Sequence, residues 1–359
     1  MKNMRHCGRT REFLIKHYQT YPKLQTEDVF KYIFQSAFGC EHLVSDEKTV
    51  LDRIKEEYAS VSTANEPYKD QLDGEYSRVW LSCLNAGLKA ETLAKLFCLS
   101  AVKEPNGVQM LKEKLDTATE LVRCGDLPLN KDDFNTALCR WQENGYPAVH
   151  HSEVFRSEYR PAYRVIANRY ADFLNVFAAI DRLLEKGDSV IAIEGGSASG
   201  KTTLASAIEK IYDCHVFHMD DFFLRPEQRT PQRFAETGGN IDKERFCEEI
   251  VNPLIKRETV RYRRFDCSTQ TLGGVITVAP KKLTVIEGAY SMHPNFARCY
   301  DFSVFLDIDT QLQRERILKR NTPQLAKRFF EEWIPLENAY FSQMKVKNRC
   351  TESVKIEKR

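Results

Sequence analysis

The chain has 359 residues, of which 53 are Lys or Arg and 51 are Asp or Glu, so its formal net charge is +2, and 42% of its residues are hydrophobic. This length favours two domains, and the apolar content is that of a globular protein. The charge balance provides no general attraction to nucleic acid or to a membrane surface, so neither is an expected partner. No apolar run reaches the roughly 18 residues of a membrane span.

Cysteine usage and the N-terminal segment bear on the cell compartment. The eleven cysteines are dispersed and form no C-x-x-C pair, which favours reduced thiols over a disulfide framework or a zinc site. The N-terminal segment has neither the apolar stretch nor the small-residue cleavage site of a secretory signal. We therefore expect a cytoplasmic protein.

Helical periodicity dominates the first half of the chain. Apolar residues recur at helical spacing in four segments, which are residues 27–38, 90–102, 108–122 and 163–186. The last segment is expected to be one long helix that ends at Gly187. No strand-like alternation of any length precedes residue 188, so residues 1–187 are predicted to form an all-α domain.

Two polar clusters in this half have no assigned role. His150, His151 and Glu153, together with Cys40 or His42, have metal-ligand side chains, although their spacing is not diagnostic. A second cluster places arginines and tyrosines at helical spacing, and its members are Arg156, Tyr159, Arg160, Tyr163 and Arg164. This second cluster could contact a phosphorylated ligand or RNA, or it could pack against the following domain.

The pattern changes after residue 187. Short apolar, β-branched runs at 189–194, 215–218, 283–286 and 304–308 alternate with helical stretches at 242–256 and 311–319. Strands that alternate with helices predict a mainly parallel sheet that is covered on both faces. The second domain is therefore an α/β domain over residues 188–359.

A glycine-rich loop with the pattern G-x-x-x-x-G-K-T follows the first of these strands. The expected nucleotide-binding residues are Gly195, Gly196, Ser197, Ala198, Ser199, Gly200, Lys201, Thr202 and Thr203. The glycines allow several N–H groups to point inward at phosphate oxygens, and the next helix presents its N-terminus to the same anion. Lys201 is expected to reach the β- and γ-phosphates, and Thr202 to place its hydroxyl on Mg²⁺.

Carboxylates follow the next strand. Asp220 and Asp221 stand at a strand's carboxyl end, where open α/β sheets bind ligands. A carboxylate there can accept the proton of a substrate hydroxyl that attacks the γ-phosphate. An acidic helix cap or turn is the alternative role.

The segment Met219-Asp220-Asp221-Phe222-Phe223, followed by Arg225-Pro226, resembles the uridine kinase / phosphoribulokinase family. That family has Q-D-S-F-Y at this point, and nicotinamide riboside kinases have Q-D-D-F-F. The resemblance implies that Asp220 is the base and lies near Mg²⁺, with Asp221 beside it at the substrate. It also implies that Asp242, in Asn240-Ile241-Asp242, binds substrate hydroxyls, although a helix N-cap is an equally good reading of that residue.

Further strands extend the resemblance. Leu283 to Gly288 is similar to the family's F-E-G strand, which implies that Glu287 helps Thr202 and Asp220 to hold Mg²⁺, a cation that prefers oxygen ligands. Residues 304–309 resemble the family's F-V-D-T-D strand and precede a basic helix. There Arg316 matches the arginine that contacts substrate and phosphate, and Arg320 is the next candidate at the nucleotide.

The substrate pocket departs from the pattern. Phe265-Asp266 resembles the start of the family's Y-D-F-x-x-H-S-R segment, but Gln270 stands at the His position and the Arg is absent. Phe265 and Tyr290, which follows Glu287-Gly288, are expected to line the substrate pocket. The substitution at Gln270 argues against a pyrimidine-specific pocket.

The resemblance therefore implies an ATP- and Mg²⁺-dependent kinase that phosphorylates a hydroxyl of a nucleoside or ribose-like metabolite, with Lys201, Asp220 and Arg316 as catalytic residues. The alternative is an NTP-dependent regulatory or RNA-linked protein whose helical domain binds a macromolecule. The acceptor, the preference for ATP over GTP and the formation of a homo-oligomer stay open.

Overall fold

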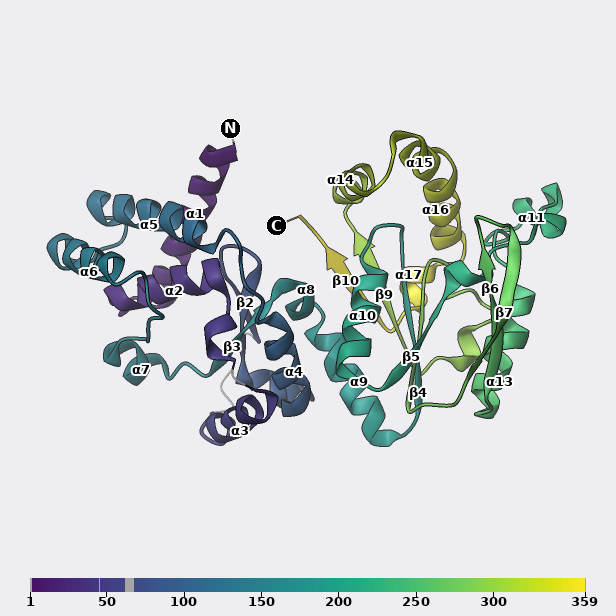
Figure 1. Ribbon diagram of the computed structural model, residues 1–359, viewed down its shortest axis with the longest axis horizontal. Coiled ribbons are helices and arrows are strands. Elements are labelled where there is room, and N and C mark those ends of the chain that lie inside the picture. The colour runs from purple at the N-terminus through teal and green to yellow at the C-terminus, as the bar shows by residue number, and fades with distance from the viewer. Residues whose placement is uncertain (1, 45, 62–67, 359) are drawn as a thin grey trace. The chain divides into compact units, whose positions relative to one another are not determined.

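The computed structural model describes residues 2–44, 46–61 and 68–358, with the backbone alone for residues 2–7. The chain divides into two compact units, Met1–Leu174 and Asn175–Arg359 (Figure 1). Whether these units are independent domains with a boundary near residue 187 stays a prediction. In the described part of the chain, no helix combines the length and the apolar character that a membrane crossing requires.

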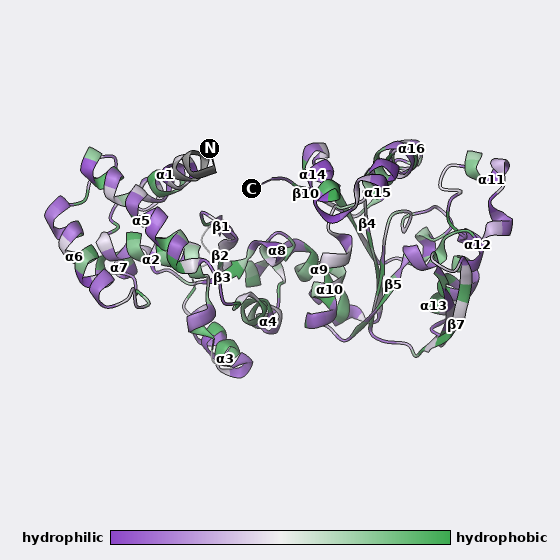
Figure 2. Ribbon diagram, turned by 45° about the horizontal axis from the view of Figure 1, so that its top comes forward, coloured by the Kyte–Doolittle hydropathy of each residue, from purple (hydrophilic) through white to green (hydrophobic). Residues whose placement is uncertain are grey.

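The N-terminal unit is mainly helical. Its helices are α1 (Lys2–Thr20), α2 (Thr26–Phe38), α3 (Glu47–Tyr58), α4 (Ala90–Ser100), α5 (Gly107–Cys124), α6 (Lys131–Glu143), α7 (Glu153–Tyr159) and α8 (Asn168–Ala171). Helix α2 buries the apolar residues that the spacing predicts, together with polar Asp28, Gln35 and Ser36. Its Phe30 stacks on Trp141 of α6 with ring centroids 4.7 Å apart. Figure 2 shows hydrophilic and hydrophobic stretches alternating along surface helices such as α3 and α6.

A small antiparallel sheet in this unit is the feature that the sequence did not predict. Its strands, in the order β1-β2-β3, are β1 (Lys69–Gln71), β2 (Tyr76–Trp80) and β3 (Tyr163–Ala167). The single helix expected over residues 163–186 is therefore wrong. Its first five residues pair with β2, and helix α9 (Leu174–Lys186) begins only after the short α8. Apolar spacing alone cannot separate such a short buried strand from helix.

The C-terminal unit contains the parallel sheet that the sequence predicts. Its five strands run in the order β10-β9-β4-β8-β5, and every neighbouring pair is parallel. The strands are β4 (Ser189–Gly195), β5 (Cys214–His218), β8 (Leu283–Glu287), β9 (Phe302–Ile308) and β10 (Glu352–Ile356). The predicted α/β unit with a parallel sheet, preceded by a mainly helical region, is confirmed. The all-α character expected of residues 1–187 is not, because β1, β2 and β3 form a sheet there.

The same unit contains further helices and a β-ribbon. The helices are α10 (Lys201–Ile211), α11 (Pro231–Ala235), α12 (Lys243–Phe246), α13 (Asn252–Lys256), α14 (Thr310–Arg320), α15 (Pro323–Arg328), α16 (Ile334–Gln343) and α17 (Val346–Arg349). The antiparallel ribbon pairs β6 (Val260–Asp266) with β7 (Thr271–Val278). Figure 1 shows α10 on one side of the sheet, and α13 with the ribbon on the other.

Strand register brings the candidate residues to one edge. Glu287 is paired with Ile193 of β4 and with His218 of β5. The segments that leave the carboxyl ends of these strands therefore lie side by side. A buried hydrophobic core in this unit includes Phe217, Phe222 and Phe246. Because such cores are closely packed, the core limits the movement of the segments that leave the strands.

Candidate active site

The phosphate loop turns sharply where β4 ends. Gly195, Ala198 and Gly200 all adopt positive φ, at 148°, 61° and 104°. A Cβ on Gly195 would lie 2.6 Å from the carbonyl oxygen of Leu306, a distance that real Cβ atoms do not tolerate. Glycine is therefore required at residue 195 both for the backbone angle and for the close approach to β9.

The loop has the features of an anion site. Gly200 is the N-cap of α10, whose first turn carries N–H groups without intrahelical acceptors. Lys201 Nζ lies 2.9 Å from the carbonyl oxygen of Gly195 and 3.0 Å from that of Gly196. The buried Ser199 hydroxyl has no hydrogen-bond partner among the described residues. A phosphate would supply an acceptor for the N–H groups of the first turn and for the Ser199 hydroxyl, and Lys201 could exchange its carbonyl acceptors for phosphate oxygens. The loop therefore fits a nucleotide.

Side chains of helices α14 and α16 form hydrogen bonds with the phosphate loop. The Glu337 carboxylate accepts hydrogen bonds from the Ser197 N–H at 2.9 Å and from the Ser197 hydroxyl at 2.6 Å. Gln313 Nε2 donates to the Ser197 carbonyl at 2.8 Å. Arg316 Nη1 donates to the carbonyl of Ala198 at 3.0 Å. These contacts hold the loop's backbone in one conformation.

Glu194 is a buried carboxyl group directly before the loop. It accepts hydrogen bonds from the N–H groups of Gly195 at 2.8 Å and Met292 at 3.0 Å, and from the Tyr340 hydroxyl at 3.1 Å. Burial nevertheless raises the pKa of Glu194 to about 7, because desolvation disfavours its charged form.

Thr202, Glu287 and His218 meet beside the loop. The Thr202 hydroxyl donates to Glu287 Oε1 at 3.1 Å, and His218 Nδ1 lies 2.6 Å from the same oxygen. This hydrogen bond to Glu287 raises the pKa of His218. The structure thus brings together the two expected metal-binding residues on α10 and β8, and adds a histidine that the sequence reasoning missed.

Asp220 lies at the same edge, in the short helical turn Met219–Phe222. Its side chain reaches solvent, but neighbouring protein atoms partly desolvate it and raise its pKa, an effect that Lys201 opposes and Glu287 reinforces. Arg320 also acts on the charge of Asp220, while its guanidinium lies 5.4 Å from the Phe329 ring centroid. Lys201, Glu287 and Arg320 are therefore all close enough to Asp220 for their charges to change its pKa.

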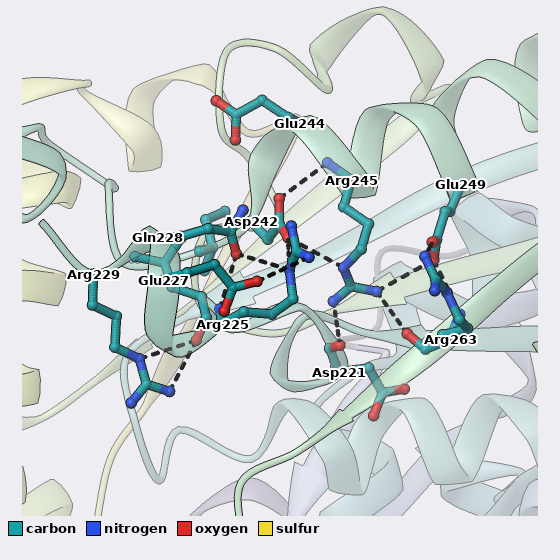
Figure 3. A network of polar contacts seen from close by, with 12 residues as sticks. Asp221, Arg225, Glu227, Gln228, Arg229, Asp242, Glu244, Arg245, Glu249 and Arg263 are labelled. Atoms are coloured by element: carbon teal, nitrogen blue, oxygen red, sulfur yellow. Dashed lines mark hydrogen bonds and ion pairs between the residues drawn. The ribbon is translucent and has the colours of Figure 1, made fainter. Parts of the chain in front are cut away.

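Two of the residues expected at the substrate, Asp221 and Asp242, form ion pairs with arginines. Figure 3 shows the Asp221 side chain pointing away from the pair that Asp242 forms with Arg245. Asp221 Oδ2 lies 3.2 Å from Arg264 Nε of the ribbon. Asp242 is 1% exposed, caps α12 through the Arg245 N–H at 3.2 Å, and pairs with Arg245 Nε at 3.3 Å. Its capping role is thus evident, whereas its contact with substrate stays a prediction.

Phe265 and Tyr290 are both buried. Phe265 lies in β6, with the Arg229 guanidinium 5.8 Å from its ring centroid. Tyr290 adopts φ 75° and packs on Tyr340 at a ring distance of 4.7 Å. Their access to a substrate stays a prediction. Gln270 lies in the turn of the ribbon with φ 57°.

Mg²⁺ suits the donor set at this edge. Thr202, Asp220 and Glu287 offer oxygen atoms, and Mg²⁺ commonly takes one or two carboxylates and completes its shell with water and nucleotide phosphates. No group of three or more His, Cys, Asp or Glu side chains arranged to hold a metal occurs in the part of the chain that the structure describes. A metal held mainly by Thr202, one carboxylate and phosphate oxygens is consistent with that finding.

Glu194, Glu337, Gln313 and His218 were not found by sequence reasoning. A charged residue inside the apolar strand 189–194 was the only available signal for Glu194. Glu337 and Gln313 contact Ser197 across 140 and 116 residues, and no local pattern announces such a contact.

The parallel sheet, the glycine loop at its carboxyl edge and the carboxylates around Lys201 define a P-loop kinase fold. Residues 190–328 match the sequence model of the Phosphoribulokinase / Uridine kinase family, which confirms the resemblance expected for the C-terminal half. The match leaves residues 1–189 uncovered.

Individual relatives agree with this match. A uridine kinase of Macrococcus caseolyticus (strain JCSC5402) is 28% identical over 141 residues, which cover 37% of this chain and 66% of that protein. A uridine kinase of Staphylococcus aureus (strain JH9) is 26% identical over 148 residues, which cover 39% and 71%. The chain thus spans about two thirds of the length of these relatives. The solved structure of a possible uridine kinase from Bacillus stearothermophilus has a TM-score of 0.38 at 22% identity, covering 49% of this chain and 96% of that one.

Proposed function

We propose that the protein transfers the γ-phosphoryl group of ATP to a hydroxyl of a nucleoside or ribose-like metabolite. The observation that carries this proposal is the convergence of Lys201, Thr202, Asp220 and Glu287 at the carboxyl edge of the parallel sheet, with Thr202 hydrogen-bonded to Glu287. A kinase of nucleoside or sugar-like substrates is also what the family match supports.

Each residue has a defined task in this reaction. Lys201 turns from the Gly195 and Gly196 carbonyls to the phosphates. Asp220 takes the proton of the acceptor hydroxyl as that oxygen bonds to the γ-phosphorus, and the bond to the β,γ-bridging oxygen breaks to release ADP. Mg²⁺, held by Thr202 and Glu287, supplies charge neutralisation on the phosphates when it is bound.

Arg316 and Arg320 neutralise negative charge on the transferring group. Arg316 donates a hydrogen bond to the Ala198 carbonyl, so it lies at the loop. Burial lowers its pKa from the usual value of an arginine, which is far above neutral pH. Arg320 lies close enough to Asp220 to affect its charge. Both stand on α14, so a small shift of that helix would move them together.

Asp220→Asn tests the proposal. The amide cannot take a proton, so phosphoryl transfer is expected to fall by about 10²–10⁴-fold, while ATP affinity, measured by calorimetric titration, changes little. Asp301→Asn is the matched control, because Asp301 caps the backbone of Val190 at the opposite end of β4. Full phosphotransfer by Asp220→Asn, with a panel of nucleosides and ribosides as acceptors, would remove Asp220 as the base.

The competing reading is an NTP-dependent switch. A switch hydrolyses the nucleotide slowly without an acceptor and is stimulated by a macromolecule. If no acceptor in the panel raised nucleotide turnover above the rate with water alone, the kinase proposal would fail.

A further inference from the structure

The N-terminal unit contains a cavity of about 890 Å³. Its walls come from α2, α3, α4, α7 and β3, all within residues 31–165. A volume of about 300–1,000 Å³ is typical of sites that enclose a small molecule. The family match begins only at residue 190, so it assigns no role to this cavity.

The charged side chains of the wall are mostly basic. Five cationic residues line the cavity against two carboxylates, and these residues are Lys31, Arg53, Arg156, Arg160 and Arg164, with Glu57 and Glu158. Both carboxylates are already paired. Glu57 is held by Arg164 at 2.8 and 3.1 Å, and Glu158 by Lys23 at 2.8 Å.

Four of the five cations have no ion pair with any residue that the structure describes, and these are Lys31, Arg53, Arg156 and Arg160. Lys31 Nζ donates instead to the Val149 carbonyl at 3.1 Å, and burial lowers its pKa to about 8. The Ser82 hydroxyl, on a residue that is 5% exposed, also lines the cavity and has no partner within the described ranges.

Arg78 adds a buried charge behind the wall. It is 0% exposed, and its Nε donates to Gln35 Oε1 at 3.0 Å, while its guanidinium lies 4.9 Å from the ring centroid of Tyr163. Both terminal nitrogens lack a hydrogen-bond partner among residues 8–44, 46–61 and 68–358. Asp70 lies opposite Arg78 in the β1–β2 register, but no ion pair joins the two within the same ranges. The charge of Arg78 still acts on Asp70, because it opposes the burial that raises the pKa of Asp70. A buried guanidinium with no ion pair in these ranges and two unsatisfied nitrogens is nevertheless costly, so a further anion nearby would relieve the site.

The wall between Arg78 and the cavity is held by a chain of hydrogen bonds. Gln35 Nε2 lies 3.2 Å from the Tyr163 hydroxyl, which lies 2.6 Å from His151 Nε2, and His151 Nδ1 lies 2.8 Å from Asp28 Oδ1. Burial lowers the pKa of His151 to about 4, so the ring is neutral and donates from Nδ1 to Asp28. Tyr163 therefore donates to Nε2. This series of hydrogen bonds fixes the polar wall before any ligand arrives. Because both ring nitrogens of His151 have hydrogen-bond partners, neither is free to bind a metal.

We propose that this cavity binds a small phosphorylated metabolite. Several unpaired arginines and a lysine around one cavity suit the two negative charges and three oxygens of a phosphate monoester better than a single carboxylate. The apolar side chains of Leu43, Val50 and Phe97 on the same wall take the organic part. The arginines and tyrosines singled out in the sequence thus face a phosphorylated ligand. This site is independent of the kinase reaction.

Calorimetric titration of the full chain tests the proposal. The protein carries Lys201→Ala, which weakens phosphate binding at the glycine loop. The probes are inorganic phosphate, ribose 5-phosphate and AMP, with ribose and adenosine as uncharged matched controls. At least one phosphorylated probe is expected to bind below about 1 mM, and the uncharged controls at least tenfold more weakly.

Variants locate the binding. Arg53→Gln and Arg156→Gln are each expected to weaken the phosphorylated probe by about tenfold or more, as loss of a charge-assisted hydrogen bond requires. Neither arginine has an ion pair in the described part of the chain, so we expect the unfolding midpoint to stay unchanged. A shifted midpoint would reveal a folding defect separately from a loss of binding. Arg140→Gln, at an exposed arginine of α6 that does not line the cavity, is the matched control.

Three results would overturn the proposal. The first is that no phosphorylated probe binds. The second is that the Arg53 and Arg156 variants bind the phosphorylated probe as tightly as the parent protein does. The third is that a single-stranded RNA binds more tightly than every small phosphate, with an affinity that falls as salt is added. Because the titration needs no phosphotransfer, a failure here leaves the kinase proposal untouched, and the reverse also holds.

Discussion

Glu194 lies inside β4, where the surrounding residues are apolar and buried, and it touches the first residue of the phosphate loop. The positive charge of Lys201 favours the ionised form of Glu194 and lowers its pKa, against the larger effect of burial. Since the pKa is about 7 in the folded chain and about 4.3 in an unfolded one, the folded state holds the extra proton between these values. Stability contributed by Glu194 is therefore present below pH 4 and is lost as pH rises toward 7.

Glu194→Gln should remove this dependence. Gln cannot ionise, so the free energy of unfolding of the variant relative to the parent should rise between pH 4.5 and 7 by up to about 3 kcal/mol. Urea unfolding at a series of pH values measures the two curves. The NH2 group of the amide cannot accept, so the variant loses the hydrogen bond from either the Gly195 N–H or the Met292 N–H at every pH. Only the difference in slope is therefore diagnostic. Parallel curves would show that Glu194 stays ionised in the folded protein.

Glycine substitutions separate two causes of strain at the residue scale. Gly195→Ala places a Cβ 2.6 Å from the Leu306 carbonyl at φ 148°, whereas Gly200→Ala meets no atom within 4 Å at φ 104°. We expect Gly195→Ala to cost about 3 kcal/mol or more and Gly200→Ala roughly 1–2 kcal/mol. Chemical denaturation gives both values, and equal costs would mean that β9 moves aside freely.

Helices α14 and α16 act at the element scale as a clamp on the phosphate loop. Glu337→Gln weakens the hydrogen bonds to Ser197, so the loop is expected to become less ordered. The KM for ATP should then rise by about tenfold, which is the factor that corresponds to one charge-assisted hydrogen bond. A double-mutant cycle with Ser197→Ala should yield a coupling of about 1–2 kcal/mol in unfolding free energy. Glu331→Gln, at an exposed carboxylate in the same helical segment, is the control. Additive effects in the cycle would mean that the contact is not energetically coupled.

Elements with a strong local signal were predicted well. Helices α2 and α14 and the strands β4, β5, β8 and β9 were expected within a few residues of their observed bounds. The strands β2 and β3 were missed, although β8 is equally short and buried and was predicted. Buried Ser77 and Arg78 interrupt the apolar run of β2, and the apolar residues of β3 also fit the helical spacing of the segment 163–186. A strand that is buried on both faces shows no alternation, and its pairing partner lies more than 80 residues away.

Two compact units describe the whole molecule. If each unit unfolds cooperatively, calorimetry of the full chain should show two transitions, and ADP with Mg²⁺ should raise only the one that belongs to the kinase unit. At a nucleotide concentration about 100 times Kd the added stability is about 2.7 kcal/mol. Lys201→Ala should abolish the shift. A single transition that moves as a whole would show that the units unfold together.

The amino-acid sequence by itself identified the candidate nucleotide site, since the loop from Gly195 to Thr203 and the carboxylate Asp220 are local features placed directly after strands. Sequence order already assigns them to one edge of a parallel sheet. Only the tertiary structure decided what surrounds them. Glu337 hydrogen-bonds to Ser197, and the buried Arg78 donates to Gln35, through contacts between elements far apart in the chain. Such contacts depend on how buried faces pack, and packing leaves no short pattern to read.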